Sequence, residues 1–299
     1  MKTKILKFTR STVLFLSIVL FFGNCSKNDE EESQNVLSQN KGNLKAASAW
    51  GRVFTDNFDN TGSWNNWART QRLDYNSSLC QYVSSNPQIA NYDYRNVLVL
   101  TATKNGNKWN SGHVKSNFSF KPARNEEYRV SAQIKLIAIN GSTWTGFSST
   151  YGVWPAFWTV QESWWPVNGE IDIVEGYSYG GSTKFASNLF FGTIFGQNLL
   201  GTSCERTYGV GDGWHMYDEY WKNENGWVTV TIQLDGYTVA TYTNAANSNL
   251  RLESFGPHNI IFNLCVGCTS WNAFDNSRIN VFSKTMMWVD YVTVDKRTL

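Results

Sequence analysis

The chain has 299 residues, a formal net charge of +2, 17 % charged residues and 41 % hydrophobic residues. This composition excludes a wholly disordered chain, and the length is sufficient for one or two domains with a sizeable core. Aromatic residues make up 15 % of the chain and include 14 Trp. Beyond residue 10 no run of Lys and Arg offers the basic surface that nucleic acid requires, so we expect no nucleic-acid partner.

Residues 1–24 resemble an export signal. Four basic residues precede or begin an apolar run over 13–22, and a run of about 10 residues is too short for a membrane span, which needs about 20. The sequence F-G-N-C over 22–25 resembles a bacterial lipobox, which implies that Cys25 becomes the lipidated first residue. An ordinary cleaved signal peptide is the alternative. Removal of 1–24 takes away four basic and no acidic residues, so the net charge becomes −2.

Residues 25–49 form the next predicted segment, a flexible tether. The segment is rich in Ser, Asn and Gln and poor in apolar residues, a composition typical of unfolded linkers. Its polar and acidic start over 26–32 resembles the surface-export signal of Bacteroidota lipoproteins. We therefore expect an exported lipoprotein at the outer membrane or the cell surface, which contacts the membrane only through its lipid anchor.

Residues 50–299 are predicted to form one all-β domain. In 228–234 the apolar residues alternate with polar ones, and Asp235-Gly236 follows as a hairpin signal. No long stretch has a helical period, and many short strands with turn residues between them are typical of a β-sandwich. The clearest predicted strands are 97–102, 128–139, 169–175, 227–234, 238–242, 260–266 and 286–294.

Four cysteines remain if Cys25 carries lipid: Cys80, Cys204, Cys265 and Cys268. Three disulfide pairings are open, the sequence cannot choose among them, and an exported protein can form them. Cys265 and Cys268 form a C-x-x-C pair, but no second pair or His completes a zinc site. We expect buried thiols or one disulfide here rather than a metal centre.

Three acidic residues, Glu170, Asp172 and Glu175, lie in a segment that is otherwise apolar. Like charges packed in one strand cost stability, which suggests a chemical role. Side chains alternate along a strand, so Glu170 and Asp172 share a face and Glu175 points the other way, unless a β-bulge inserts one residue. With a bulge, all three carboxylates line one groove. This suits retaining glycoside hydrolysis, which needs a nucleophile and an acid/base about 5–5.5 Å apart.

The pattern E-x-D-x-x-E resembles the bulged signature of glycoside hydrolase family 16. The surrounding residues strengthen the resemblance: 154–158 read W-P-A-F-W, 262–267 read F-N-L-C-V-G, and 288–294 read W-V-D-Y-V-T-V. The resemblance covers about residues 50–299. It implies a concanavalin A-like β-jelly-roll sandwich, with a substrate cleft on the concave sheet. It also implies a monomer that cleaves a β-linked polysaccharide internally by double displacement.

The resemblance assigns a role to each acid. Glu170 corresponds to the nucleophile, Asp172 to its partner and Glu175 to the general acid/base. It also implies Trp side chains that stack on sugar rings, although core packing is the alternative for each of them. The predicted substrate-binding residues are Trp154, Trp158, Trp165, Trp271 and Asn188.

The family requires no cofactor, but Asp290 matches a position that often helps to bind a structural calcium ion. The usual partner carboxylate is replaced by Asn57, so calcium would depend on other oxygen ligands. His215, in a W-H-x-Y run, matches a family position that is mostly structural.

The substrate remains open at this level. Many β-glucan-cleaving members carry a His in the strand after the acidic motif, whereas 187–193 here read S-N-L-F-F-G-T. The runs 154–160 and 169–176 nevertheless look more like the glucan-cleaving members, and no basic cluster near the motif would suit sulfate. We expect β-1,3- or mixed-linkage β-1,3-1,4-glucan. The alternatives are an algal galactan such as agar or porphyran, a host mucin O-glycan, or a non-catalytic surface glycan-binding protein.

Overall fold

The computed structural model describes residues 48–73, 78–199, 212–268, 273–279 and 282–299, together with the backbone of 202–206. The predicted signal peptide, Cys25 and almost all of the predicted tether lie outside these residues. No helix in the described part of the chain is long and apolar enough to cross a membrane.

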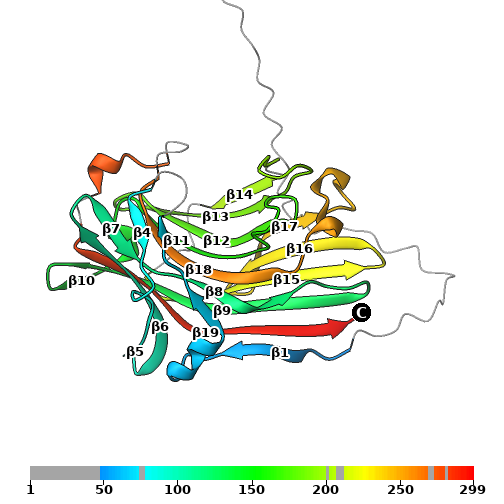
Figure 1. The fold of residues 1–299 in the computed structure, drawn as a ribbon, viewed down its shortest axis with the longest axis horizontal. Helices are drawn as coiled ribbons and strands as arrows, with labels where there is room; N and C mark the ends of the chain where they lie inside the picture. The colour runs from blue at the N-terminus through cyan, green and yellow to red at the C-terminus, as the bar shows by residue number, and fades with distance from the viewer. Residues whose placement is uncertain (1–47, 74–77, 200–201, 207–211, 269–272, 280–281) are drawn as a thin grey trace, which may run out of the picture. The chain divides into compact units, whose positions relative to one another are not determined.

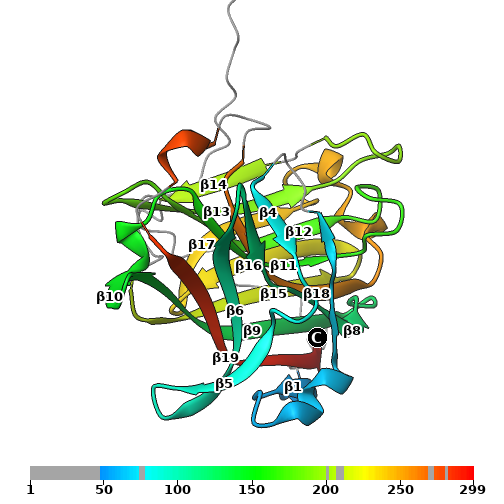
Figure 2. The same cartoon turned by 60° about the vertical axis from the view of Figure 1, so that its left-hand side comes forward.

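Two β-sheets make up the described fold (Figures 1 and 2), so the all-β prediction is confirmed. The first sheet has twelve strands, and its main path runs β17 (Tyr237–Thr243), β16 (Trp227–Leu234), β15 (Trp214–Glu224), β9 (Glu126–Asn140), β19 (Lys284–Thr298), β6 (Arg95–Asn105), β7 (Lys108–Ser111), β4 (Cys80–Tyr82), β3 (Arg72–Leu73). Three more strands pair with this path: β1 (Gly51–Asp56) with β19, β10 (Thr143–Gly146) with β9, and β5 (Gln88–Tyr92) with β6.

The second sheet has seven strands and contains the acidic motif. Its order is β14 (Thr202–Arg206), β13 (Thr183–Phe190), β12 (Glu170–Ser178), β11 (Val153–Val160), β18 (His258–Val266), β8 (His113–Phe120), β2 (Trp67–Arg69). The helical segments described are short 3-10 turns: η1 (Thr61–Asn65), η2 (Phe147–Ser149), η3 (Ser248–Leu250), η4 (Leu252–Ser254) and η5 (Asn276–Arg278). Figure 1 shows β11, β12 and β13 side by side, so the motif strand lies inside its sheet.

Alternating apolar residues of both sheets form the core between them. On β16, Val228, Val230, Ile232 and Leu234 are buried while the residues between them are at least partly exposed, as the sequence pattern predicts. Burying such side chains contributes roughly 1.5–3 kcal/mol each. Ile171 on β12 joins the same core from the second sheet.

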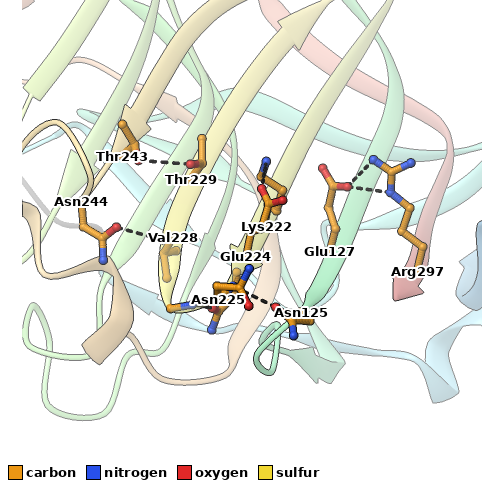
Figure 3. Close-up of polar contacts among 12 residues, drawn as sticks. Asn125, Glu127, Lys222, Glu224, Asn225, Val228, Thr229, Thr243, Asn244 and Arg297 are labelled. Atoms are coloured by element: carbon orange, nitrogen blue, oxygen red, sulfur yellow. Dashed lines mark hydrogen bonds and ion pairs between the residues drawn. The ribbon is translucent and has the colours of Figure 1, made fainter. Parts of the chain in front are cut away.

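Turns fix the register of the first sheet. Asp235 and Gly236 both have positive φ, +51° and +82°, as a two-residue type I′ hairpin requires, so the predicted β16–β17 hairpin is confirmed. At the other end of β16, Asn225 N–H donates to Asn125 Oδ1 at 2.8 Å, and Val228 N–H donates to Asn244 Oδ1 at 2.8 Å (Figure 3). These side chains satisfy backbone groups that the turn leaves without strand partners.

The described cysteines lie in the interior. Cys80 is a buried thiol without a disulfide bond, and its Sγ accepts the N–H of Val266 at 2.9 Å. Cys265 and Cys268 are also buried, and the Cys265 thiol contacts the Gly267 carbonyl oxygen at 3.6 Å. The Cys204 side chain lies outside the described part of the structure. No cluster of three or more potential metal ligands occurs among the described residues.

Candidate active site

A β-bulge in β12 brings the three acids to one face. Asp172 pairs with Asn188 of β13, and the next pair joins Glu175 to Ala186, so β12 has two residues where β13 has one. The register to β11 shifts at the same place. The extra residue reverses the alternation beyond it, so Glu175 returns to the face of Glu170 and Asp172. The predicted bulge is confirmed, and it follows from the E-x-D-x-x-E spacing.

The three carboxyl groups line a single groove of about 580 Å³. Three predicted substrate-binding residues, Trp154, Trp158 and Trp165, line the same groove. The remaining lining residues are Arg72, Tyr82, Ala156, Val160, Glu162, Asn263 and Cys265. The groove is thus lined by both aromatic rings and carboxyl groups, a suitable surface for a sugar ring with its apolar faces and polar rim.

Glu170 accepts one hydrogen bond from a groove tryptophan. Trp165 Nε1–H donates to Glu170 Oε2 at 2.8 Å. Burial, followed by the nearby charge of Glu175, raises the pKa of Glu170 to about 8. Removing a carboxylate from water disfavours its charged form, and a second negative charge acts in the same direction.

Glu175 accepts more hydrogen bonds from N–H groups than Glu170 does. Trp154 Nε1–H donates to Glu175 Oε1 at 3.0 Å, and Asn188 Nδ2–H donates to Oε2. Burial raises the pKa of Glu175, while these two N–H donors oppose the rise. Asn188 lies on β13 and is buried, so the structure shows it holding a predicted catalytic residue. Contact with substrate remains a prediction for Asn188.

Asp172 hydrogen-bonds Glu175, whereas the family resemblance pairs it with Glu170. Burial and the charges of both glutamates raise the pKa of Asp172 well above its usual value. Three carboxyl groups this close in a buried site cannot all be ionised, so they share protons. The N–H donors on both Glu175 oxygens favour its ionised form, which places the shared proton on Asp172 toward Glu175 before substrate binds.

The predicted tryptophans are held by their indole edges. Trp158 Nε1–H donates to Asn263 Oδ1 at 2.7 Å, and Trp154 and Trp165 each donate to a catalytic-candidate carboxylate as described above. Trp158 and Trp165 remain partly exposed, whereas Trp154 is buried in the core and stacks on Tyr177 with ring centroids 5.6 Å apart. Trp271 lies outside the described residues. His215 contacts Asp235 at 2.8 Å within the first sheet, consistent with a structural position.

Sequence reasoning missed a charged cluster at the groove. Arg72 and Glu162 line it, and Lys115 binds Glu162. The sequence interpretation found no basic cluster near the acidic motif, and the structure corrects this. The three residues are distant in the sequence and meet only because β8 and β3 approach the segment after β11, so no local signal reveals them.

Asp290, the predicted calcium position, is paired with an arginine in this structure. Asp290 lies beside Asn57 and Asp59 in a surface pocket, but Arg95 Nη1 contacts Asp290 Oδ2 at 2.5 Å. A guanidinium already neutralises the carboxylate that would bind the metal, and Asn57 contributes no charge. Calcium sites need several oxygen ligands with enough negative charge. Asp59 is the other carboxylate that lines this pocket, and calcium binding here stays a prediction.

A family model described as the XgeA-like catalytic GH16 domain matches residues 129–187, which include the acidic motif and the W-P-A-F-W run. No curated protein sequence matches the chain. Among solved structures, a GH16 protein of the Bacteroides ovatus mixed-linkage glucan locus, in complex with a G4G4G3G product, is 23 % identical with a TM-score of 0.62. That alignment covers 81 % of this chain and 99 % of the other.

Two further glucanase structures are similar. An endo-1,3-β-glucanase from Streptomyces sioyaensis has a TM-score of 0.68 at 23 % identity, over 85 % of this chain and 99 % of that one. The fold is that of these glucanases. A laminarinase from Flavobacterium sp. UMI-01 has a TM-score of 0.61 at 20 % identity, over 82 % and 99 % of the two chains. The predicted jelly-roll sandwich is therefore confirmed, and the fold together with the family-model match supports a glycoside hydrolase.

Proposed function

We propose that the protein is a retaining endo-β-glycosidase, with β-1,3-glucan or mixed-linkage β-1,3-1,4-glucan as its substrate. The observation that carries the proposal is the bulge in β12, which directs Glu170, Asp172 and Glu175 into one Trp-lined groove. Structural neighbours described as a mixed-linkage glucan protein and as β-1,3-glucanases support the choice of glucan.

In the proposed reaction Glu170 attacks the anomeric carbon and the bond to the leaving oxygen breaks as Glu175 protonates that oxygen. A glycosyl-enzyme ester on Glu170 results. Glu175, now a carboxylate, removes a proton from water, which attacks the same carbon and releases the sugar with net retention. The Trp165 N–H holds Glu170 in place for both steps.

Asp172 supplies the proton that Glu175 needs. A proton that moves along the hydrogen bond from Asp172 to Glu175 gives Glu175 its acid form and removes its negative charge. The transfer moves the negative charge to Asp172, which also interacts electrostatically with Glu170, so Glu170 must still release its own proton before it attacks.

The test compares the chain from residue 26 onward with its Glu170→Gln variant. Both are incubated with laminarin, barley β-glucan, agarose, porphyran and mucin glycans, and the products are sized. We expect short oligosaccharides from a β-glucan, made only by the unmutated protein. Products from a galactan or a mucin glycan, and from no β-glucan, would show that the proposed substrate class is wrong and would identify the correct one. No product from any polymer, with binding retained, would support the glycan-binding alternative instead.

We further propose export as a lipoprotein anchored through Cys25, on the basis of the 1–25 sequence alone. In a bacterial host that processes lipoproteins, the full chain should incorporate labelled palmitate and partition with membranes. Cys25→Ala should abolish the label and release the protein from the membrane fraction. A variant that keeps the label would exclude Cys25 as the anchor, whereas a secreted, unlabelled wild type would support an ordinary signal peptide.

A further inference from the structure

A charged cluster lies at the Glu170 end of the groove. Glu162 bridges two cations: Lys115 Nζ contacts Glu162 Oε2 at 2.6 Å, and Arg72 Nη1 contacts Oε1 at 3.7 Å. The three side chains are only about one third exposed, at 30 %, 34 % and 35 % for Lys115, Arg72 and Glu162. Arg72 and Glu162 line the same groove as the acids.

The groove as a whole does not attract anions. Its described lining contains four carboxyl groups, those of Glu162 and the acidic motif, against one guanidinium, that of Arg72. Even with protons shared among the motif acids, no excess of positive charge faces the groove. A polymer that carries sulfate or carboxylate on every repeat would have to bring its charges close to these carboxyl groups, at a Coulombic cost.

The hydrogen-bonding chemistry of the cluster favours uncharged sugars. Arginine and lysine alone offer only donors, which suits sulfate or carboxylate ligands. Glu162 adds acceptor oxygens between them. A sugar hydroxyl both donates and accepts, so a cluster of mixed donors and acceptors can bind adjacent hydroxyls in one orientation.

Resting on the proposed function, we propose that Arg72, Lys115 and Glu162 form a subsite for an uncharged sugar unit. In this subsite Glu162 determines specificity, because it neutralises the two cations and thereby excludes sulfated or carboxylated sugars. The enzyme is then restricted to neutral glycans by a residue that lies outside the acidic motif.

The test measures binding calorimetrically in the Glu170→Gln protein, which cannot turn over its ligand. The probes are laminaritetraose and sulfated laminaritetraose. Adding Glu162→Gln keeps the side-chain size and removes the charge. We expect the affinity for laminaritetraose to fall about tenfold and that for the sulfated form to rise about tenfold, a typical effect of one charge-assisted contact. Adding Lys115→Met instead removes a cation, so it should weaken binding of both ligands.

Glu224→Gln is the matched control, because Glu224 also pairs with a lysine, Lys222 at 2.8 Å, and lies far along β15 (Figure 3). It should leave both affinities unchanged. Laminaritetraose binding that neither Glu162→Gln nor Lys115→Met alters would overturn this inference alone, since the proposed function would stand. A parent protein that binds only the sulfated ligand, or neither, would overturn the inference through the proposed function on which it rests.

Discussion

The hydrogen-bond partners of the two glutamates differ, and the difference affects their roles. Glu175 accepts N–H groups on both oxygens, whereas Glu170 accepts one from Trp165. In the protein without substrate, Glu170 keeps its proton at neutral pH, because its pKa is raised to about 8. The proposed roles require the opposite distribution of protons in the complex with substrate, in which Glu170 is ionised and Glu175 is protonated. The Asp172–Glu175 hydrogen bond provides a route for the proton that Glu175 gains, while Glu170 releases its own proton.

Azide rescue tests these roles directly. With an activated aryl β-glycoside of laminaribiose, Glu170→Ala should lose nearly all activity, and azide should restore turnover as the α-glycosyl azide, because a single displacement inverts the anomeric carbon. Glu175→Ala should lose about 10²–10⁴-fold on polysaccharide, and azide should give the β-glycosyl azide by attack on the glycosyl-enzyme. The product anomer is read by NMR. The reverse pair of anomers would mean that the roles of Glu170 and Glu175 are exchanged. Glu224→Ala is the control and should hydrolyse the substrate without azide.

At the scale of one element, the bulge in β12 accommodates one extra residue between Asp172 and Glu175 and so keeps both side chains on the same face. Deletion of Val174 leaves one residue between Asp172 and Glu175, which matches the one residue between Asn188 and Ala186 on β13. The strand becomes regular, alternation puts all three acids on one face, and the pairing beyond Glu175 does not shift. We therefore expect the deletion to retain activity within about tenfold, a barrier change of about 1.4 kcal/mol.

An insertion is the matched opposite of this deletion. One Ala placed between Ile173 and Val174, with the bulge still holding a single extra residue, shifts the pairing beyond the bulge by one residue. That shift directs Glu175 away from the groove, so activity should fall at least about 10²-fold. Hydrolysis rates and melting temperatures are measured for both variants. If the folded deletion variant were inactive and the insertion variant active, the bulge would not be what aligns Glu175.

Local pattern predicted the parts of the fold and site that depend on near neighbours in the sequence. In three places a few neighbouring residues were enough to predict the geometry. These are the alternation in 228–234, the Asp235-Gly236 turn and the spacing of the acids. Short strands such as β3 and β7 carry no such pattern, because pairing across the sheet fixes them. Arg72 reaches the groove and Lys115 reaches Glu162 through strand order alone, and Asp172 meets Glu175 through side-chain packing. None of these contacts could be predicted.

At the scale of the whole molecule, a buried polar chain joins the two sheets beneath the groove. Glu219 of β15, Thr159 of β11 and His258 of β18 are fully buried. His258 Nε2 lies 3.1 Å from the Asn168 carbonyl oxygen, which can only accept, so Nε2 carries the proton. Burial lowers the pKa of His258 to about 3, so Nδ1 is an acceptor for Thr159 Oγ1 at 3.2 Å.

Glu219 must therefore be the donor to Thr159 in this series of hydrogen bonds. The single Thr159 hydroxyl proton goes to His258, so the 3.0 Å contact between Thr159 Oγ1 and Glu219 Oε2 requires a proton on Glu219. Burial raises the pKa of Glu219 to about 8, in agreement with this. The link between the sheets is therefore neutral, and it holds as long as Glu219 keeps its proton.

The stability of the protein should consequently fall as pH rises from about 5 to 8. Above its ordinary pKa of 4.5 the unfolded Glu219 releases its proton, while the folded one keeps it until about 8. The unfolded state then binds fewer protons, which costs up to about 1.4 kcal/mol of unfolding free energy per pH unit. Glu219→Gln keeps an N–H donor to Thr159 and cannot ionise. The variant should show a smaller loss of melting temperature between pH 5.5 and 8 than the unmutated protein.

Glu170 titrates in the same range and contributes a slope of the same sign, so the quantity to compare is the difference between variant and parent. Glu224→Gln, on the same strand, is the control: its exposed carboxylate has a pKa lowered by Lys222, and its removal should leave the slope between pH 5.5 and 8 unchanged. An equal slope in the Glu219→Gln and parent proteins would mean that Glu219 is already ionised in the folded state. The hydroxyl of Thr159 would then donate to Glu219, and His258 would have to be protonated at Nδ1 to complete the chain.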